Sequence, residues 1–429
     1  MSKSPDPDDG RDIEVPDMPD FSRIPYRSPE EAIYRVDDDS VPRRVADNPL
    51  YLALPRPRKP SEVRTVLEAE NPPLDPEVRN HSPEVRRERI DDLDPAVCTL
   101  RRHIQLEEMV MSTIRNSFAY RPWHGLYIET AAQLATGIGQ TASAKPNHRG
   151  GAVGAGSLFG DVGLGKTLAM TSLLMACPQT ILHVSFRGRR LGIQQVVWLY
   201  LSMPPKASAY GLLAWIASIL DYILKTSYRN DLDRSRNHTA QVRIIARALA
   251  VHAVGVIFCD ELQNIEVGSK SERMVFENTL QELINYTHTR WVFIGTKAAR
   301  QTIQSSALQR RMCGERGQII WEPMIPGPEW DEFFKWLLAR LVTRGPTPFD
   351  QRLSVAANGL TGGVPDNAKR LITAAESNII GHSRFPEEQL TTEILEKTMK
   401  ENFPIKYDCV RTRYKDLLSK FDREQSESG

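Results

Sequence analysis

The stretch that decides the fold is Gly160–Thr167, which reads GDVGLGKT. It matches the spacing G-x-x-x-x-G-K-[ST], in which the glycines let backbone N–H groups approach phosphate oxygens closely. An apolar run, Ser157–Phe159, precedes it, and a helical run, Thr167–Ala176, follows it. We therefore expect a strand, a phosphate-binding loop and a helix in this order, a context that makes a chance match rare.

The loop predicts binding of ATP with Mg²⁺. A helix beginning at Lys166 would direct the positive end of its dipole toward the phosphates. Lys166 is expected to reach the β- and γ-phosphates, and the Thr167 hydroxyl is expected to ligate the magnesium ion. The residues predicted to line the nucleotide are Gly160, Asp161, Val162, Gly163, Leu164, Gly165, Lys166, Thr167 and Leu168.

A second acidic element is Val256–Glu261, VIFCDE, an apolar run that ends in two carboxylates. This is the form of a Walker B strand. Asp260 is expected to hold magnesium, directly or through water, and Glu261 to act as the general base that orients and polarises the attacking water. Two adjacent charges at a buried strand end without a cation would be costly, so this element and the loop support each other.

Two further elements complete the predicted site. Thr296 ends the next apolar run, where its side chain can sense the γ-phosphate or cap the following turn. Arg310 and Arg311 come next, with Arg316 as a further alternative. An arginine supplied by a neighbouring subunit stabilises charge at the γ-phosphate and is worth about 10³–10⁵ in rate. Exposed arginines are common, so this role stays open on composition alone.

The composition is that of a globular protein: 429 residues, a formal net charge of +1, 41% hydrophobic and 25% charged. There is no run of about 18 apolar residues, so we expect no membrane span and a cytoplasmic protein. The near-zero charge excludes a uniformly basic nucleic-acid coat but not a local basic groove. The cysteines form no CxxC pair, and we expect neutral thiols in a reducing compartment.

Downstream of the loop, apolar runs alternate with helical patterns. The predicted strands are Thr180–Phe186, Gln194–Ser202, Val254–Asp260 and Trp291–Thr296, and the helices between them are Ala209–Lys225, Thr239–His252 and Glu272–Tyr286. This alternation predicts an α/β fold with a mostly parallel sheet covered by helices on both faces. The β-signal fades from about Pro328, and the helical patterns Gly327–Thr343, Val364–Ser377 and Thr391–Glu401 predict a smaller all-α domain.

The flanks differ in composition from the centre. Residues 1–40 hold 12 Asp/Glu against 5 Lys/Arg and predict an acidic disordered tail. Residues 41–95 are rich in proline and basic, with one apolar island, Asp47–Pro57, expected to dock on the core or on a neighbouring subunit. We place the α/β domain at 96–326, the helical domain at 327–401, and a polar tail with a few apolar anchors at 402–429.

The order of phosphate loop, Asp-Glu pair, strand-end Thr and double Arg resembles an AAA+ ATPase. More specifically, the chain resembles the TnsC/TniB family, the ATPase regulators of Tn-type bacterial DNA transposition. The phrases that carry this resemblance, over about residues 45–380, are DNPLYLALP (Asp47–Pro55), QVVWLYL (Gln195–Leu201), VIFCDELQNI (Val256–Ile265), VFIGTKAAR (Val292–Arg300) and IIWEPM (Ile319–Met324). The loop and acid pair are common to all AAA+ proteins. The specific part is DELQ (Asp260–Gln263) followed by IGTKAAR (Ile294–Arg300), and the phrase WEP (Trp321–Pro323) after the double Arg.

The resemblance implies a P-loop AAA+ domain followed by a helical lid. It implies that ATP binds between adjacent copies, which assemble as rings or filaments on double-stranded DNA. Partners would be a TnsA/TnsB-like transposase and a TnsD/TniQ-like target selector or guide-RNA complex, in the bacterial nucleoid. Hydrolysis would disassemble the assembly. Carried over by residue, Thr296 takes the first sensor role and Arg311, or Arg310, the arginine-finger role, while Lys369 or Arg370 takes the second sensor role.

Two basic segments are candidates for contact with DNA. One is Arg187, Arg189 and Arg190, between the predicted strands Thr180–Phe186 and Gln194–Ser202. The other is Lys206, in the loop after Gln195–Leu201. Contacts to phosphates would be independent of base sequence, with affinity falling with salt by a slope of about −0.9 per neutralised phosphate. The alternative for each segment is a solvated basic loop.

Two other function classes stay open. One is an AAA+ or STAND-type NTPase that remodels or signals through a protein partner without DNA. The other is an adaptor that binds nucleotide for structure only. DNA-stimulated hydrolysis of ATP distinguishes the transposition regulator from both.

Overall fold

The computed structural model describes residues 25–36, 38–69, 74–119, 121, 123, 156–287, 289–303 and 318–428. Within them, the central element is a five-stranded sheet in the order β5-β6-β7-β2-β8, in which all neighbours are parallel. Its strands are β2 (Gly156–Gly160), β5 (Trp198–Ser202), β6 (Val256–Asp260), β7 (Arg290–Gly295) and β8 (Gln318–Trp321). This confirms the predicted α/β class with a mostly parallel sheet.

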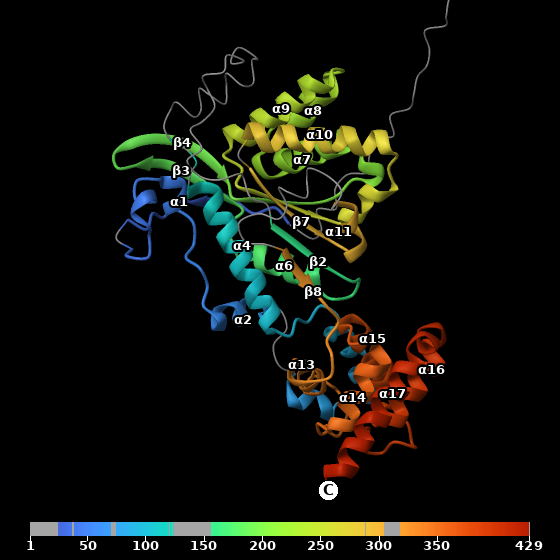
Figure 1. Cartoon of the computed structure of the whole chain (residues 1–429). Coiled ribbons are helices and arrows are strands. Elements are labelled where there is room, and N and C mark those ends of the chain that lie inside the picture. Colours follow the sequence, from blue (N-terminus) through green and yellow to red (C-terminus); the bar gives the residue numbers. More distant parts are fainter. Residues whose placement is uncertain are drawn as a thin grey trace, which may run out of the picture.

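Helices cover both faces of this sheet, because side chains along each buried strand alternate between two apolar clusters. Ile257 and Cys259 of β6 face one cluster, while Val256 and Phe258 face the other. The first face is covered by α7 (Ala209–Leu224), α8 (Tyr228–Arg234), α9 (His238–Val251) and α10 (Lys270–Thr287). The second is covered by α1 (Pro49–Leu52), α2 (Pro60–Glu68), α4 (Arg101–Ala119) and α6 (Lys166–Met175), as Figure 1 shows.

The strand order brings three sequence motifs to one edge. The loop strand β2 and the acidic strand β6 are not neighbours, because β7 lies between them. All three run parallel, so Gly160, Asp260 and Gly295 end their strands on the same side of the sheet. Loops that follow the carboxyl ends of parallel strands are the usual place for a ligand site.

A separate three-stranded sheet, in the order β1-β3-β4, stands beside the central one. It consists of β1 (Glu30–Glu31), β3 (Thr180–Phe186) and β4 (Arg189–Val196), with β3 and β4 forming an antiparallel hairpin. The prediction of one strand over Gln194–Ser202 was therefore wrong. The chain changes sheets at Val197, whose N–H donates to Gln179 O at 2.8 Å. An unbroken apolar run does not reveal such a change.

The N-terminal extension packs on the rest of the chain. Its apolar island docks on the core of the same chain, with Leu50, Leu52 and Leu54 at most 1% exposed. The prediction of a disordered tail over 1–40 does not hold for residues 25–36. There β1 pairs with β3, and the Tyr34 ring packs edge-on against Phe186 at 4.8 Å between ring centres.

The C-terminal helical domain consists of α13 (Pro328–Leu338), α14 (Gln351–Thr361), α15 (Pro365–Ile379), α16 (Thr392–Asn402) and α17 (Pro404–Ser428) around one apolar cluster. The prediction of a tail at 402–429 was wrong for α17. Tyr407, Val410, Tyr414 and Leu418 recur at helical spacing and face the cluster. Leu93, Cys98 and Leu100 also belong to this cluster, so the boundary predicted at residue 95 does not separate packing units.

The joint between the sheet and the helical domain is formed by backbone groups. Met324 N–H donates to Gly363 O at 2.8 Å, and the Asn358 side-chain amide donates to Met324 O at 2.9 Å. Gly363 has a φ of +73°, and a Cβ there would lie 1.9 Å from Met324 O. Only glycine fits this position without displacing the joint.

Burial of the thiols agrees with the expectation of neutral cysteines. Cys98, Cys177 and Cys259 are buried, and burial raises the pKa of Cys98 and of Cys177 to about 12. Cys409 is exposed on α17, and Cys313 lies outside the described residues. In the part of the chain that the structure describes, no helix is long and apolar enough to span a bilayer.

A buried ion pair ties the N-terminal extension to the helical domain. Arg86, in α3 (Pro83–Glu88), is fully buried and donates to both oxygens of Glu388 and to Val342 O. Burial alone would raise the pKa of Glu388. The hydrogen bonds from Arg86 and from the N–H groups of Gly381 and Arg344 outweigh it and lower that pKa to about 2.

We expect Glu388→Gln to lower the free energy of unfolding by about 3–5 kcal/mol at pH 7, because it leaves the Arg86 guanidinium buried without a counter-charge. Denaturant unfolding measures this. The control is Asp422→Asn, which removes a half-exposed partner of Arg352 and should cost at most about 1 kcal/mol.

The same pair predicts a pH dependence. The pKa of Glu388 is lower in the folded chain than its ordinary 4.5, so the pair's stabilisation is present above pH 4.5 and is lost as the pH falls toward 2. The wild type should lose more stability than Glu388→Gln between pH 5 and about 2.5. Parallel stability curves for the two proteins would contradict the assignment.

Candidate functional site

The phosphate loop leaves β2 at Gly160 and enters α6 at Lys166. Gly163 and Gly165 have φ angles of +83° and +82°, in the left-handed region that only glycine enters freely. At Gly163 a Cβ would also lie 3.0–3.1 Å from Val364 and Asp366 of the helical domain. The two glycines therefore give the loop its shape, and the free N–H groups at the start of α6 form an anion site.

Lys166 is held inside this loop. Its side chain folds back so that Nζ donates to Gly160 O at 2.9 Å and to Asp161 O at 2.8 Å. The residue is 9% exposed, and burial lowers the pKa of its ammonium. The charge is thus fixed at the mouth of the loop, where phosphate oxygens would meet it.

Asp260, at the end of β6, is the most connected group of the site. Its Oδ2 accepts hydrogen bonds from the Thr167 hydroxyl and from the Tyr200 hydroxyl, both at 2.6 Å. Its Oδ1 accepts from the Glu261 N–H at 2.8 Å. The carboxylate is 3% exposed, so these donors compensate for its removal from water.

The donor set suits Mg²⁺. Thr167 and Asp260 offer hard oxygen atoms, and Mg²⁺ is usually bound by one or two protein oxygens together with phosphates and water. Among the described residues, no three His, Cys, Asp or Glu gather into a cage of their own. A cation here would share its coordination with a bound triphosphate.

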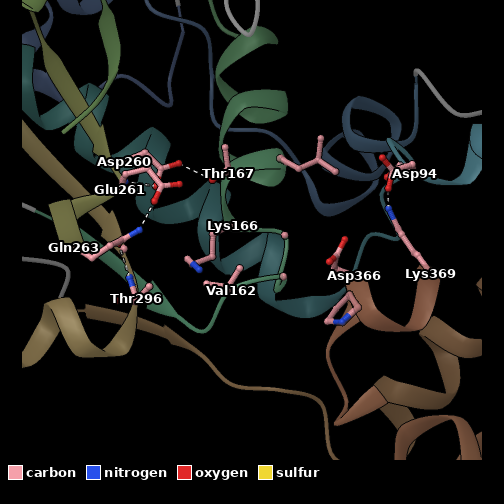
Figure 2. A pocket seen from close by; sticks show the side chains of 15 residues that line it. Asp94, Val162, Lys166, Thr167, Asp260, Glu261, Gln263, Thr296, Asp366 and Lys369 are labelled. Atoms are coloured by element: carbon pink, nitrogen blue, oxygen red, sulfur yellow. Dashed lines mark hydrogen bonds between the residues drawn. The ribbon is translucent and has the colours of Figure 1, made fainter. Parts of the chain in front are cut away.

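A second chain of contacts holds Glu261, as Figure 2 shows. Glu261 has a φ of +56°, which is strained for a side-chain-bearing residue. The Gln263 amide donates to the Glu261 carboxylate, and its carbonyl oxygen accepts from Thr296 N–H at 3.3 Å. The Thr296 hydroxyl accepts from Ala299 N–H and caps α11 (Lys297–Ile303), which is the capping role, while its role as a sensor of the γ-phosphate stays a prediction.

These groups line one cavity of about 290 Å³ between the sheet and the helical domain. Its wall contains predicted residues of the loop, the acidic strand and the Thr296 strand end. The lining residues are Asp94, Val162, Gly163, Gly165, Lys166, Thr167, Leu168, Asp260, Glu261, Gln263, Gly295, Thr296, Pro365, Asp366 and Lys369. The motifs that the sequence separates by more than 130 residues are therefore brought together.

Lys369 lies in this wall, but its ammonium is engaged elsewhere. Nζ donates to Asp94 O at 2.7 Å and to Ala96 O at 2.6 Å, and burial lowers the pKa of the side chain to about 8. Arg370, the alternative second sensor, does not line the cavity and pairs with Asp366 at 3.0 Å. Lys369 thus ties the helical domain to the segment before α4.

Other predicted residues have structural partners. The Asp161 carboxylate pairs with Lys297 at 3.3 Å, and Leu164 is buried in the second apolar cluster. Gly160 lies at the end of β2, where a Cβ would meet Trp321 O at 2.7 Å. The arginine-finger candidates Arg310, Arg311 and Arg316 lie outside the described residues.

The DNA-contact candidates occupy two separate places. Arg187 is the first turn residue of the β3–β4 hairpin and pairs with Asp47, while Arg189 and Arg190 begin β4 and are exposed. Lys206 follows β5 in a short 3-10 turn, and its carbonyl lies against Gly268 beside the acidic strand. The two segments are held by different elements.

Sequence reasoning missed Gln263, Tyr200, Asp94, Asp366 and Pro365. Gln263 had a signal, because it follows Glu261 by two residues within the acidic motif. Tyr200 had none, since an aromatic residue in a buried strand usually indicates core packing. The other three come from segments far away in sequence, and only the fold brings them to the cavity.

We expect Lys166→Ala to abolish the stabilisation of the protein by ATP, because the fixed ammonium at the loop is lost. A ligand at about 100 times its Kd stabilises the folded state by about 2.7 kcal/mol, which a thermal-shift assay resolves as a rise in Tm. Lys420→Ala, an exposed change on α17, is the control and should keep the full shift. An undiminished shift in Lys166→Ala would contradict the assigned site.

One of the comparisons with known proteins, a family match, agrees with this geometry. Residues 151–303 match the family model described as an AAA domain. A comparison with curated proteins gave no match. Among solved structures, a Walker-type ATPase of Pyrococcus abyssi is similar with a TM-score of 0.35 and 10% identity, over 66% of this chain and 75% of that one. Over residues 151–303 the chain is similar to AAA domains, and its α/β sheet with a phosphate loop is followed by a helical lid domain.

Proposed function

We propose that the protein is an ATP-dependent, DNA-binding regulator of transposition. It would oligomerise on duplex target DNA, link a target selector to a transposase, and hydrolyse ATP to disassemble or reset. The observation that carries the ATPase part is the gathering of Lys166, Thr167, Asp260 and Glu261 around one cavity. The transposition part rests on the resemblance to the TnsC/TniB family.

In this proposal the loop N–H groups and Lys166 hold the triphosphate, and Thr167 with Asp260 holds Mg²⁺. The ion, when bound, neutralises charge on the phosphate oxygens. Glu261 accepts the proton of the attacking water as general base. Gln263 fixes the Glu261 carboxylate, because its amide bridges Glu261 and the backbone of Thr296.

Assembly would complete the site. Arg311, or else Arg310 or Arg316, would reach the γ-phosphate of the adjacent copy and stabilise the charge that develops there. Assembly and hydrolysis would then depend on each other. The TnsA/TnsB-like and TnsD/TniQ-like partners of the family are the corresponding candidates here, with the terminal segments as their docking places.

The β3–β4 hairpin supports a DNA contact. Arg189 and Arg190 are exposed and adjacent at its tip, next to Arg187. Guanidinium groups on a protruding hairpin suit phosphate oxygens and read no bases. Lys206 is the second candidate; it also lies near Glu272, a carboxyl whose pKa is lowered mainly by hydrogen bonds from Ser269 and to a smaller extent by the Lys206 charge.

One observation favours the alternative, an NTPase that acts on a protein partner without DNA. On the same hairpin, Leu182 and Val184 are 39% and 50% exposed. Exposed apolar side chains suit a protein surface better than a phosphate backbone. Failure of DNA to stimulate hydrolysis would favour this alternative.

Replacing the proposed base tests the ATPase. Glu261→Gln should slow hydrolysis by about 10²–10⁴-fold while ATP still binds, since it removes the proton acceptor but keeps the size of the side chain. Stacked assemblies on DNA should accumulate in negative-stain images with ATP. The control is Glu401→Gln on the lid surface; unchanged turnover in Glu261→Gln would refute the role of base.

Salt titration of duplex DNA binding tests the hairpin. With ATP present, the double variant Arg189→Ala/Arg190→Ala should bind DNA more weakly for all base sequences. Its slope of log K against log salt should fall by about 1.8 if both residues contact phosphates. Arg411→Ala/Lys415→Ala on the exposed face of α17 removes equal charge and should keep the slope. Equal slopes for the two double variants would exclude the hairpin.

A further inference from the structure

Tyr200 reaches the proposed magnesium site from a neighbouring strand. β5 and β6 run parallel, with Tyr200 opposite Phe258 and Ser202 opposite Asp260. Tyr200 therefore lies on the same face of the sheet as Asp260, two residues before the position opposite it. Its hydroxyl donates to Asp260 Oδ2 at 2.6 Å. The residue is 8% exposed, so packing holds the hydroxyl in place.

The Tyr200 hydroxyl is one of two donors to the same oxygen of Asp260. Thr167 donates to the same oxygen, Oδ2, whereas Oδ1 accepts from the Glu261 backbone. Thr167 is also the residue whose hydroxyl oxygen is suited to bind the cation. Tyr200 is the side-chain donor to Asp260 that belongs to neither the phosphate loop nor the acidic motif, and it holds Oδ2 independently of Thr167.

We propose that Tyr200 is a positioning residue for magnesium: it fixes the Asp260 carboxylate so that Asp260 and Thr167 receive the ion together. The inference rests on the proposed ATP function. With two donors on Oδ2 and one on Oδ1, Asp260 has little freedom to turn, and the ion meets a carboxylate already in place. Groups that orient a metal-binding side chain typically contribute 10–100-fold to metal affinity.

A purely structural role would give a different result. Tyr200 belongs to the apolar cluster on its face of the sheet, together with Val256 and Phe258 of the neighbouring strand β6. If the residue served only to fill this cluster, phenylalanine would replace it with no effect on magnesium. The effect of magnesium on ATP binding separates the two roles.

The experiment is calorimetric titration of the full chain with ATP, once with EDTA and once over a series of Mg²⁺ concentrations. In Tyr200→Phe, we expect ATP affinity without metal to stay close to the wild type and the apparent Mg²⁺ affinity of the complex to fall by about 10-fold or more. The matched control is Tyr228→Phe, which removes a half-buried hydroxyl bonded to His252 at 2.8 Å, away from the cavity.

A double-variant cycle tests whether Tyr200 acts through Asp260. In an Asp260→Asn background, Tyr200→Phe should change the Mg²⁺ affinity by less than about 2-fold, because the group it positions is already altered. Mn²⁺ binding followed by electron paramagnetic resonance reads the same site without turnover, and thermal unfolding checks that each variant folds.

The outcomes are distinguishable. Wild-type protein that binds no ATP would overturn the proposed function and this inference together. If wild type binds ATP with Mg²⁺ and Tyr200→Phe has the same Mg²⁺ affinity, the positioning role is overturned while the ATP function stands. An equal loss in Tyr228→Phe, or a full additional loss in the Asp260→Asn background, would also overturn it.

Discussion

The hydrogen bond between Thr167 and Asp260 is the contact on which the site depends. It joins the first turn of α6, which follows β2, to the end of β6, although β7 lies between β2 and β6 in the sheet. Each group is held by its own element. Thr167 lies in the helix after the phosphate loop, and Asp260 ends a buried strand and also accepts from the Tyr200 hydroxyl and the Glu261 N–H. A buried carboxylate requires such partners, and the strand order that supplies them also brings Thr296 and Gln263 next to Glu261.

The N-terminal extension connects the two halves of the molecule. Its first part packs under the sheet through α1 and α2, and its later part joins the lid through the Arg86–Glu388 pair and the apolar residue Leu93. Lys369 then returns from the lid to the backbone of Asp94 and Ala96 beside the cavity. The lid is thus held to the rest of the chain both near the cavity, through Lys369, and far from it, through the Arg86–Glu388 pair.

Most of the centre of the fold could be predicted from the sequence because its signals are local. The loop GDVGLGKT, the Asp260–Glu261 pair and the alternation of apolar and helical runs each occupy a short window. The rest depended on distant partners. Helix α14 went unrecognised because Ser354 and Asn358 are polar, and they are buried only because Asp331 and Met324 provide their hydrogen bonds. For the same reason, the partners of Lys369 and of Tyr200 carried no signal in the sequence.

The joint at Gly363 sets a condition on any natural variant of this chain. The backbone oxygen of Met324 occupies the space in which every other amino acid would place its first side-chain carbon. The Met324 backbone is fixed on both sides. Its N–H donates a hydrogen bond to Gly363 O, and its oxygen accepts one from the Asn358 side-chain amide. A variant that carries alanine here must therefore displace the backbone at this joint, which changes how its lid meets the sheet.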